Sequence, residues 1–151
     1  HNREEYIMQI NFKKMTTTAI VPTRGTSESA GYDLYADNDE TIGIAPHSTL
    51  QIPTNIAMAI PNGYFGGIYP RSGLATKRNI RMANCVGVID ADYRGNVIVP
   101  LHNDSNEMVT IEPHERVAQL IIQKYEPIEF IEIEDLDETE RGEGGFGSTG
   151  I

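Results

Sequence analysis

Two carboxylates spaced two residues apart are the groups in this chain best placed to act on a bound substrate. Asp90 and Asp92 lie in NCVGVIDADYRGNV (84–97), which we interpret as a hairpin with residues 94–96 near its tip. Residues two apart on a strand share a face, although this rule weakens near a turn. A carboxylate here can orient a water molecule or hold the turn through an Asx-type hydrogen bond. Tyr93 fits either rim packing or a platform for a flat ring.

A second stretch combines groups that bind anions. PRSGLA (70–75) contains an arginine, a serine and a glycine at the start of the expected short helix SGLATKR (72–78), with Ser72 as its N-cap. Helix N-terminal amides, a hydroxyl and a guanidinium would then converge on one anion. A helix that is merely capped explains the same residues equally well.

Two further segments place polar side chains among apolar ones. AGYDLYA (30–36) contains Asp33, which by itself fits a turn or strand-edge carboxylate better than a catalytic group. HERVAQLII (114–122) inserts Arg116 and Gln119 into a strand made otherwise of apolar residues. Buried polar groups without partners are costly, so we expect partners for both, and structural partners are the default.

The end of the sequence, RGEGGFGSTG (141–150), has five glycines in ten residues around one phenylalanine. Ordering so much glycine is entropically unfavourable, so a disordered tail is the simpler interpretation. The segment nevertheless offers a charge, a stacking ring and two hydroxyls on a backbone that can approach a ligand closely. It is not a Walker A loop, because no lysine follows its last glycine.

The charge distribution excludes one class of partner. The chain of 151 residues has 12 Lys and Arg against 22 Asp and Glu, and eight of the acids lie in 126–140, where there is no base. A broad basic face for duplex nucleic acid is therefore excluded. One acid-free stretch of eleven residues gathers four cations, which suits a small polyanion or reflects chance clustering. They are Arg71, Lys77, Arg78 and Arg81.

Other features point to an intracellular protein. No apolar run reaches the ~20 residues of a membrane span, and the first residues lack the apolar core of a secretion signal. The single cysteine, Cys85, excludes an internal disulfide and fits a reducing compartment. The four histidines lack metal-ligand spacing, which argues against a protein-held zinc. We expect a cytoplasmic protein, or a nuclear one if the source is a eukaryote.

The elements that must position these groups are short strands. β-Branched segments separated by Gly, Pro and Asn turns occur at 48–52, 56–60, 96–101, 107–111, 116–122 and 128–133. In the second of them, Ile56, Met58 and Ile60 share a face. No segment other than 72–78 fits a helix, so the pattern predicts an all-β sandwich, jelly roll or small barrel.

Taken together and in order, five segments resemble the five motifs of the homotrimeric dUTPase family. They are AGYDLYA (30–36), PRSGLA (70–75), GVIDADYRGNV (87–97), PHERVAQLII (113–122) and RGEGGFGSTG (141–150). The resemblance spans about residues 20–150. It implies an all-β, jelly-roll-like distorted barrel over residues 1–140, with one short helix. Residues 1–7 are expected to be disordered or vector-derived, and the Gly-rich arm 141–151 is expected to close over an active site.

The resemblance implies Mg²⁺-dependent hydrolysis of dUTP to dUMP and pyrophosphate, which keeps uracil out of DNA and supplies dUMP for thymidylate synthesis. The sites would lie at subunit interfaces of a homotrimer, with no nucleic-acid or membrane partner. Asp90 would hold the sugar 3′-hydroxyl and the water that attacks the α-phosphorus. Phosphates and waters would hold most of the Mg²⁺ coordination, with Asp33 in its outer shell or orienting Arg71. Asp90, Asp33 and Arg71 are therefore the expected catalytic residues.

The resemblance also assigns the substrate contacts. Tyr93 would exclude a 2′-hydroxyl, Asn84 would read the base edge, and Phe146 would stack on uracil. Base and sugar contacts are expected from Asn84, Gly87, Val88, Ile89, Asp90, Tyr93 and Ile98. Phosphate contacts from a neighbouring subunit are expected from Arg71, Ser72, Gly73 and Gln119. The arm would contribute Arg141, Phe146, Gly147, Ser148 and Thr149, with Arg141, Ser148 and Thr149 on the γ-phosphate.

Three alternatives remain at this point. A dCTP deaminase has the same fold, but needs a catalytic Glu near its second motif and lacks the Phe-centred arm. A non-catalytic trimeric binding or regulatory protein would need neither Asp90 nor Phe146. A carbohydrate-binding jelly roll is a poorer fit, because the chain contains no Trp.

Overall fold

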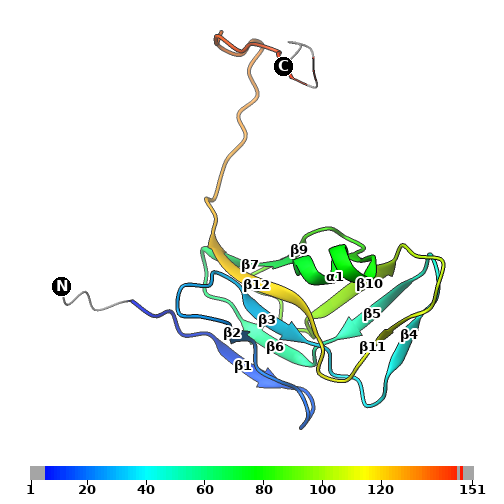
Figure 1. The fold of residues 1–151 in the computed structure, drawn as a ribbon. Helices are drawn as coiled ribbons and strands as arrows, with labels where there is room; N and C mark the ends of the chain where they lie inside the picture. The colour runs from blue at the N-terminus through cyan, green and yellow to red at the C-terminus, as the bar shows by residue number, and fades with distance from the viewer. Residues whose placement is uncertain (1–5, 146, 148–151) are drawn as a thin grey trace.

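The computed structural model describes residues 6–145 and 147, and the backbone alone of residues 75–77. In this part of the chain, strands make up nearly all the regular structure, with one short helix, as expected (Figure 1). The elements in chain order are β1 (Asn11–Lys14), β2 (Thr23–Arg24), β3 (Tyr32–Tyr35), β4 (Ile42–Ile44), β5 (Thr49–Pro53), β6 (Ile56–Ala59), β7 (Tyr64–Tyr69), α1 (Ser72–Arg78), β8 (Ile80–Met82), β9 (Gly87–Ile89), β10 (Ile98–Asn103), β11 (Val109–Ile111) and β12 (Arg116–Lys124).

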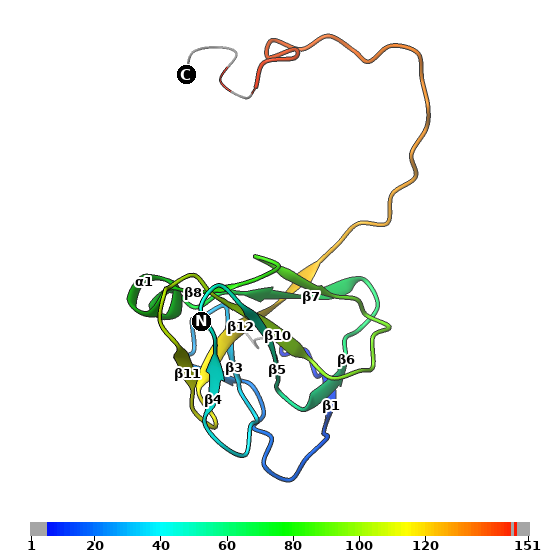
Figure 2. The same cartoon turned by 90° about the vertical axis from the view of Figure 1, so that its right-hand side faces the viewer.

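The strands pair antiparallel and wrap around one interior, as in a jelly-roll-like barrel (Figure 2). The largest sheet has the order β2-β3-β12-β7-β9, and a second has the order β5-β10-β8. The pairs β1-β6 and β11-β4 complete the described sheets. Because β12 lies between β3 and β7, segments distant in sequence become neighbours in the sheet that carries most of the candidate site residues.

Buried aliphatic side chains from almost every strand meet in one core. Ile56, Met58 and Ile60 are all buried, in agreement with the face predicted for them. Burying each such side chain contributes about 1.5–3 kcal/mol. The largest fully buried apolar side chains are Leu34, Ile44, Ile52, Ile56, Ile80, Leu101, Ile111, Val99 and Val117.

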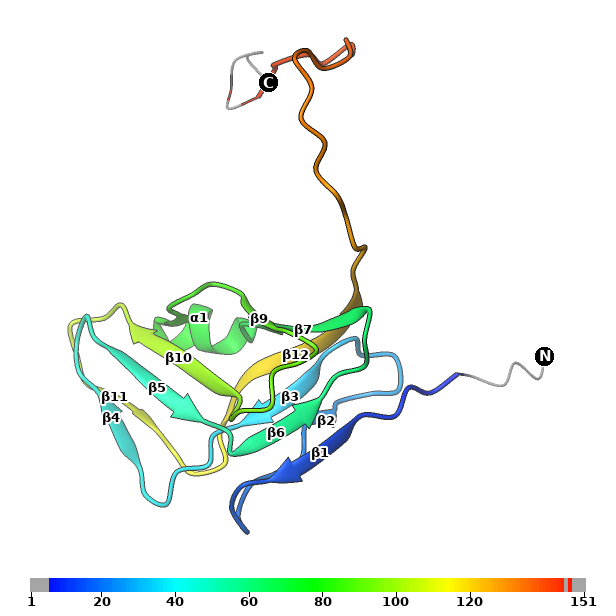
Figure 3. The ribbon, with the colours of Figure 1, turned by 180° about the vertical axis from the view of Figure 1, so that it is seen from behind.

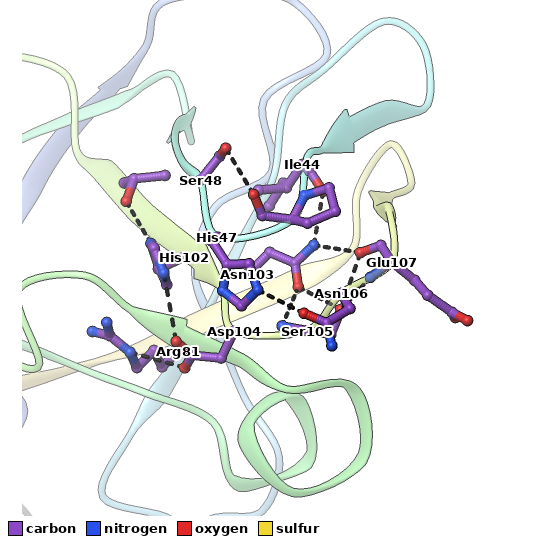
Figure 4. Close-up of polar contacts among 12 residues, drawn as sticks. Ile44, His47, Ser48, Arg81, His102, Asn103, Asp104, Ser105, Asn106 and Glu107 are labelled. Atoms are coloured by element: carbon purple, nitrogen blue, oxygen red, sulfur yellow. Dashed lines mark hydrogen bonds and ion pairs between the residues drawn. The ribbon is translucent and has the colours of Figure 1, made fainter.

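A buried asparagine fixes the far end of β10 (Figure 4). The Asn103 side chain donates hydrogen bonds to the carbonyls of Ile44 and Glu107, at 2.9 and 2.7 Å. Its Oδ1 accepts from the Ser105 backbone N–H at 2.9 Å and from the Ser105 hydroxyl at 2.7 Å. With both ends of its amide satisfied, Asn103 stabilises the turn into β11 from inside the barrel.

The predicted strand at 128–133 is wrong. After β12 the described residues contain no further strand, and the chain leaves the barrel as an extended segment (Figure 3). Phe130 is 91% exposed and Ile131 77% exposed. Both residues have high β propensity, but no strand among the described residues pairs with this segment, and strand formation depends on such pairing.

The predicted hairpin over 84–97 is also wrong as a strand pair. β9 pairs with β7, whereas β10 pairs with β5 and β8. The chain turns earlier than expected, where the Tyr93 N–H donates to the Asp90 carbonyl at 3.1 Å. The stretch 94–96 follows this turn and returns toward β10 without ladder hydrogen bonds.

The helix begins at Ser72 rather than being capped by it. Arg71 is the N-cap residue, with an extended backbone (φ −95°, ψ 132°) and no side-chain capping bond. Its guanidinium is directed elsewhere, because Nε lies 3.1 Å from the Asp33 carboxylate. At the other end Asn79 adopts a left-handed conformation (φ 54°) and donates its N–H to the Leu74 carbonyl.

No helix among residues 6–145 has the length and apolar character needed to cross a membrane.

Candidate functional site

The residues predicted to contact base and sugar line a single cavity of about 230 Å³ between β9 and the start of β10. Ile68 and Met82 contribute apolar walls, and Asn96 and Val97 complete the lining. The seven predicted residues found together here are Asn84, Gly87, Val88, Ile89, Asp90, Tyr93 and Ile98.

Glycines allow this cavity to be narrow. A Cβ on Gly87 would lie 3.2 Å from the Ile68 Cβ and 3.3 Å from the Asn84 amide nitrogen. A Cβ on Gly95 would lie 2.5 Å from the Tyr93 hydroxyl, which is impossible without displacing the ring. The Tyr93 hydroxyl donates to the Asn96 carbonyl at 2.8 Å, while the residue remains 45% exposed. The ring is therefore held at its tip and open to a ligand.

Asp90 lies where this cavity meets a larger, more open hollow of about 650 Å³, which Asp92, Phe65 and Tyr125 also line. The side chain of Asp90 makes no hydrogen bond or ion pair with any described residue. The Asn84 amide likewise has no side-chain partner within this part of the chain. Both groups are thus available to a ligand.

The residues predicted to bind phosphates line a different cavity, of about 350 Å³. It contains Asp33 together with Arg71, Ser72, Gly73 and Gln119. The sheet register explains this grouping, because Gln119 is the direct neighbour of Asp33 on one side and of Tyr69 on the other. Tyr69 ends β7, and Arg71 follows two residues later.

Asp33 organises the cations of this cavity. One of its oxygens lies 3.1 Å from the Arg71 Nε, and the other lies 3.9 Å from an Arg116 terminal nitrogen. Gln119 donates to the Pro70 carbonyl at 3.0 Å. A Cβ on Gly31 would lie 2.2 Å from the Gln119 side-chain oxygen, so glycine is required for this approach. Arg116 and Gln119 both have the partners expected for them.

The cations of the acid-free stretch 71–81 do not form an unpaired basic patch among the described residues. Acids from other segments of the chain pair with three of its members: Arg71 with Asp33, Arg78 with Glu115 at 2.5 Å, and Arg81 with Asp104 at 2.9 Å. The side chain of the fourth, Lys77, lies outside the described residues. Of the three paired arginines, only Arg71 lines the phosphate cavity. The sequence did not show these pairs, because the acids lie 23 or more residues away.

The donor set of the phosphate cavity constrains what cation it could take. The described residues contain no cluster of three His, Cys, Asp or Glu side chains able to hold a metal. Asp33 supplies the carboxylate of this cavity and already faces two arginines. One carboxylate fits a cation that keeps water and phosphate ligands, as Mg²⁺ does, and does not fit a cation that requires an all-protein cage.

The sequence analysis missed a buried carboxylate, Asp37, that is linked through Asn55 to Asn96 of the base cavity. The Asp37 side chain is 3% exposed. Burial raises its pKa, but hydrogen bonds from Thr16, Asn55 and Thr18 and the nearby His114 outweigh burial and lower the pKa below its usual value. Asn55 donates to this carboxylate at 2.7 Å. The hydrogen-bonded residues are separated by 18 or more positions in the sequence, so no local sequence pattern predicts these bonds.

We expect Asp37→Asn to lower the free energy of unfolding at pH 7 by about 1.5–3 kcal/mol, the usual range for a charge-assisted hydrogen bond. Because the folded-state pKa is lowered, this stabilisation is present above the unfolded pKa of about 3.9 and disappears as pH falls through the folded value. Urea unfolding at several pH values should show the two proteins converging below about pH 4. The exposed neighbour variant Asp39→Asn should stay close to wild type throughout; a constant gap for Asp37→Asn at every pH would contradict the assignment.

The C-terminal arm is only partly described. Arg141 and Gly144 form a turn, in which the Arg141 Nε donates to the Gly144 carbonyl at 2.6 Å. Gly147 has a positive φ of 77°. Phe146, Ser148 and Thr149, predicted to contact the nucleotide, lie outside the described residues. The described residues 141–145 of the arm stand well away from the barrel of their own chain (Figures 1 and 2).

A family model and individual relatives both place this chain in one family. A family model described as dUTPase matches residues 17–150. Deoxyuridine 5′-triphosphate nucleotidohydrolase of Finegoldia magna is 50% identical over 130 residues, covering 86% of this chain and 91% of the relative. The enzyme of the same name from Rickettsia felis is 47% identical over 146 residues, covering 96% of this chain and 99% of the relative.

Solved structures give the same result. The dUTPase of Staphylococcus bacteriophage 80alpha, a mutant with dUpNHpp, superposes with a TM-score of 0.85 at 30% identity, covering 95% of this chain and 99% of that one. A mutant dUTPase from phage phi11 of S. aureus has a TM-score of 0.76 at 25% identity, covering 85% of this chain and 98% of that one. That structure is described as revealing the coordination of a structural Mg(II) ion. From its sequence and its fold, this chain belongs to the dUTPase family.

Proposed function

We propose that the protein hydrolyses dUTP to dUMP and pyrophosphate. The observation that carries this proposal is the 230 Å³ cavity, in which Asn84, Asp90 and Tyr93 face one small space beside the backbone of β9. The product dUMP would supply thymidylate synthesis, and removal of dUTP would keep uracil out of DNA. Cys85 is a free, exposed thiol, which fits a reducing compartment such as the cytoplasm or a eukaryotic nucleus.

The base is selected by the fit and hydrogen bonding of this cavity. Asn84 and the backbone of β9 would hydrogen-bond the uracil edge, while the close approach at Gly87 leaves little room for the thymine methyl. Cytosine would leave mismatched donors and acceptors unpaired, and a buried unpaired polar group is strongly unfavourable. The cavity therefore favours uracil through both its volume and its polar groups.

The attack on the α-phosphorus requires a positioned water. The Asp90 side chain has no partner among the described residues and lies at the mouth of the base cavity, where it would hold the sugar 3′-hydroxyl and that water. Phosphate anions repel a nucleophile, so a carboxylate that positions and polarises the water lowers the barrier. Proton transfer from this water to Asp90 would accompany formation of the new phosphorus–oxygen bond, with pyrophosphate as the leaving group.

The phosphate chain would lie in the second cavity. Arg71, oriented through its Nε by Asp33, would present its remaining donors to the phosphates, with Ser72, Gly73 and Gln119 around them. Mg²⁺ bound with the triphosphate would supply neutralisation of the phosphate charge. Asp33 would reach it through coordinated water, which matches the single carboxylate of this cavity.

We propose that each active site is shared between subunits of a homotrimer. The two cavities share no lining residue. In the sheet order β2-β3-β12-β7-β9, three strand spacings separate β3, which carries Asp33, from β9, a distance of about 14 Å. A nucleotide with its base beside β9 would then receive Arg71 from a neighbouring barrel. The barrel of residues 1–140 would position the site, and the arm of residues 141–151 would close over it.

The direct test is a pyrophosphate-release assay comparing dUTP with dTTP, dCTP and UTP, with and without Mg²⁺. Selective turnover of dUTP that requires Mg²⁺ supports the proposal. Release of ammonia from dCTP would instead support a dCTP deaminase, and binding of dUTP without any turnover would support a regulatory protein.

Tyr93→Ala should raise activity on UTP relative to dUTP, because the ring that would clash with a 2′-hydroxyl is removed. We expect the dUTP-to-UTP ratio of kcat/KM to fall by about tenfold or more, as expected when steric rejection is lost. The comparison variant Tyr93→Phe keeps the ring but loses its hydrogen bond to the Asn96 carbonyl, so its selectivity should lie between those of wild type and Tyr93→Ala. Unchanged selectivity in Tyr93→Ala would remove Tyr93 from this role.

A further inference from the structure

The loop that carries Asp90 and Tyr93 lacks the support of a strand pair. Residues 90–97 form no strand, and their backbone is bonded to the barrel at Val97, whose N–H donates to the Ile56 carbonyl at 2.9 Å and whose carbonyl accepts the Thr54 N–H at 3.0 Å. Within the loop, Arg94 donates to the Ala91 carbonyl at 2.6 Å, and Tyr93 donates to the Asn96 carbonyl. These bonds fix the loop to itself but do not attach it to the barrel.

Asn96 adds a side-chain attachment next to this backbone pairing. Its amide nitrogen donates to the Asn55 Oδ1 at 2.7 Å, and its Oδ1 accepts the Asn55 backbone N–H at 2.9 Å. This reciprocal pair forms only because Asn55 is left-handed, with φ 55°, so that its backbone and side chain both face Asn96. The Asn55 carbonyl in turn accepts the Met15 N–H at 2.8 Å, which anchors the turn to the N-terminal segment.

Asp37 fixes the direction in which the Asn55 amide points. A carboxylate only accepts hydrogen bonds, so the Asn55 group facing it at 2.7 Å must be the NH₂. The Asn55 oxygen must then face Asn96, whose NH₂ it accepts, and the Asn96 oxygen must face the Asn55 N–H. The Thr16 hydroxyl also donates to Asp37, and the His114 ring lies 3.7 Å away. One buried charge thereby orders the whole chain of amides.

We propose that Asn55 and Asp37 are positioning residues for sugar selection, acting through Asn96 on Tyr93. The buried carboxylate sets the Asn55 amide, and this amide holds Asn96. The Asn96 carbonyl holds the Tyr93 hydroxyl at the wall of the base cavity. This inference rests on the proposed function, because it assigns to Tyr93 the exclusion of a 2′-hydroxyl. Neither positioning residue lines the cavity itself.

Asn55→Gly is the test, because glycine accepts the left-handed backbone and removes only the amide. A matched control exists in Asn79→Gly, since Asn79 is equally left-handed (φ 54°) and lies outside this network, at the end of α1. We expect Asn55→Gly to raise KM for dUTP more than it lowers kcat and to reduce the dUTP-to-UTP ratio of kcat/KM by about tenfold. Amide hydrogen exchange across residues 90–97 of the ligand-free protein should become severalfold faster. Asn79→Gly should change neither.

Two readouts separate this inference from the proposed function. If wild type turns over dUTP selectively but Asn55→Gly and Asn79→Gly match it in selectivity, the positioning role is wrong and the function stands. If wild type shows no dUTP turnover, the proposed function fails, and with it the role in sugar selection. Unchanged exchange over residues 90–97 in Asn55→Gly would overturn the proposed attachment of the loop in either case.

Discussion

Asp90→Asn should bind dUTP and keep its assembly while turnover falls by about 10²–10⁴-fold, the usual contribution of a positioned general base. The amide preserves the size of the side chain but removes the charge that orients and polarises water. Because Asp90 has no side-chain partner among the described residues, the substitution leaves no other group unpaired. The effect should therefore appear in kcat and leave stability nearly unchanged.

Single-turnover kinetics and calorimetric titration with a non-hydrolysable dUTP analogue would measure the two effects separately. Asp92→Asn is the matched control, since Asp92 is also exposed in the same loop but lines only the open hollow beside the base cavity. It should retain near-wild-type turnover. If Asp90→Asn hydrolyses dUTP within a few-fold of wild type, Asp90 does not position the water.

Mixing two inactive variants should restore activity if sites are shared. Arg71→Ala removes the phosphate-binding guanidinium and should lower turnover by about 10²-fold or more. In a mixed trimer with Asp90→Asn, some sites receive an intact Arg71 from one subunit and an intact Asp90 from its neighbour. With random assembly at equal amounts, about one site in four should be complete, so activity should recover to roughly a quarter of wild type.

Mass spectrometry of the intact assemblies would verify that the two variants have mixed. Differently tagged copies of Arg71→Ala alone, co-expressed in the same way, should show no recovery. Sites contained within one chain predict that the mixed assemblies are no more active than the separate variants, and this result would exclude sharing of Arg71 and Asp90 between subunits.

The residues of the base cavity, which the family resemblance assigned to base and sugar contacts, are close in sequence. Residues 84–98 supply most of its lining, and a chain that returns on itself within such a short span brings them together. The phosphate cavity is different, since Asp33, Arg71 and Gln119 come from three separate segments. Their grouping was expected only from the family resemblance. The structure gives the physical reason, which is the antiparallel register of β3, β12 and β7.

Long-range side-chain pairs set the limit of sequence reasoning here. Asn55 and Asn96 are 41 residues apart, and neither residue type nor spacing indicates that they form a reciprocal pair. The helix spans 72–78 as predicted, but its N-cap is Arg71 rather than Ser72, and the Arg71 side chain pairs with the distant Asp33 instead of capping the helix. The segment 128–133 has the composition of a strand without a partner strand in the chain, so local propensity alone misassigned it.

Hydrolysis of dUTP in ¹⁸O-labelled water, with both products weighed by mass spectrometry, tests the central claim most directly. Attack of a water held by Asp90 on the α-phosphorus predicts one labelled oxygen in dUMP and none in pyrophosphate. Label in pyrophosphate, or dUDP and phosphate as the products, would show that the water attacks a different phosphorus and would contradict the proposed mechanism.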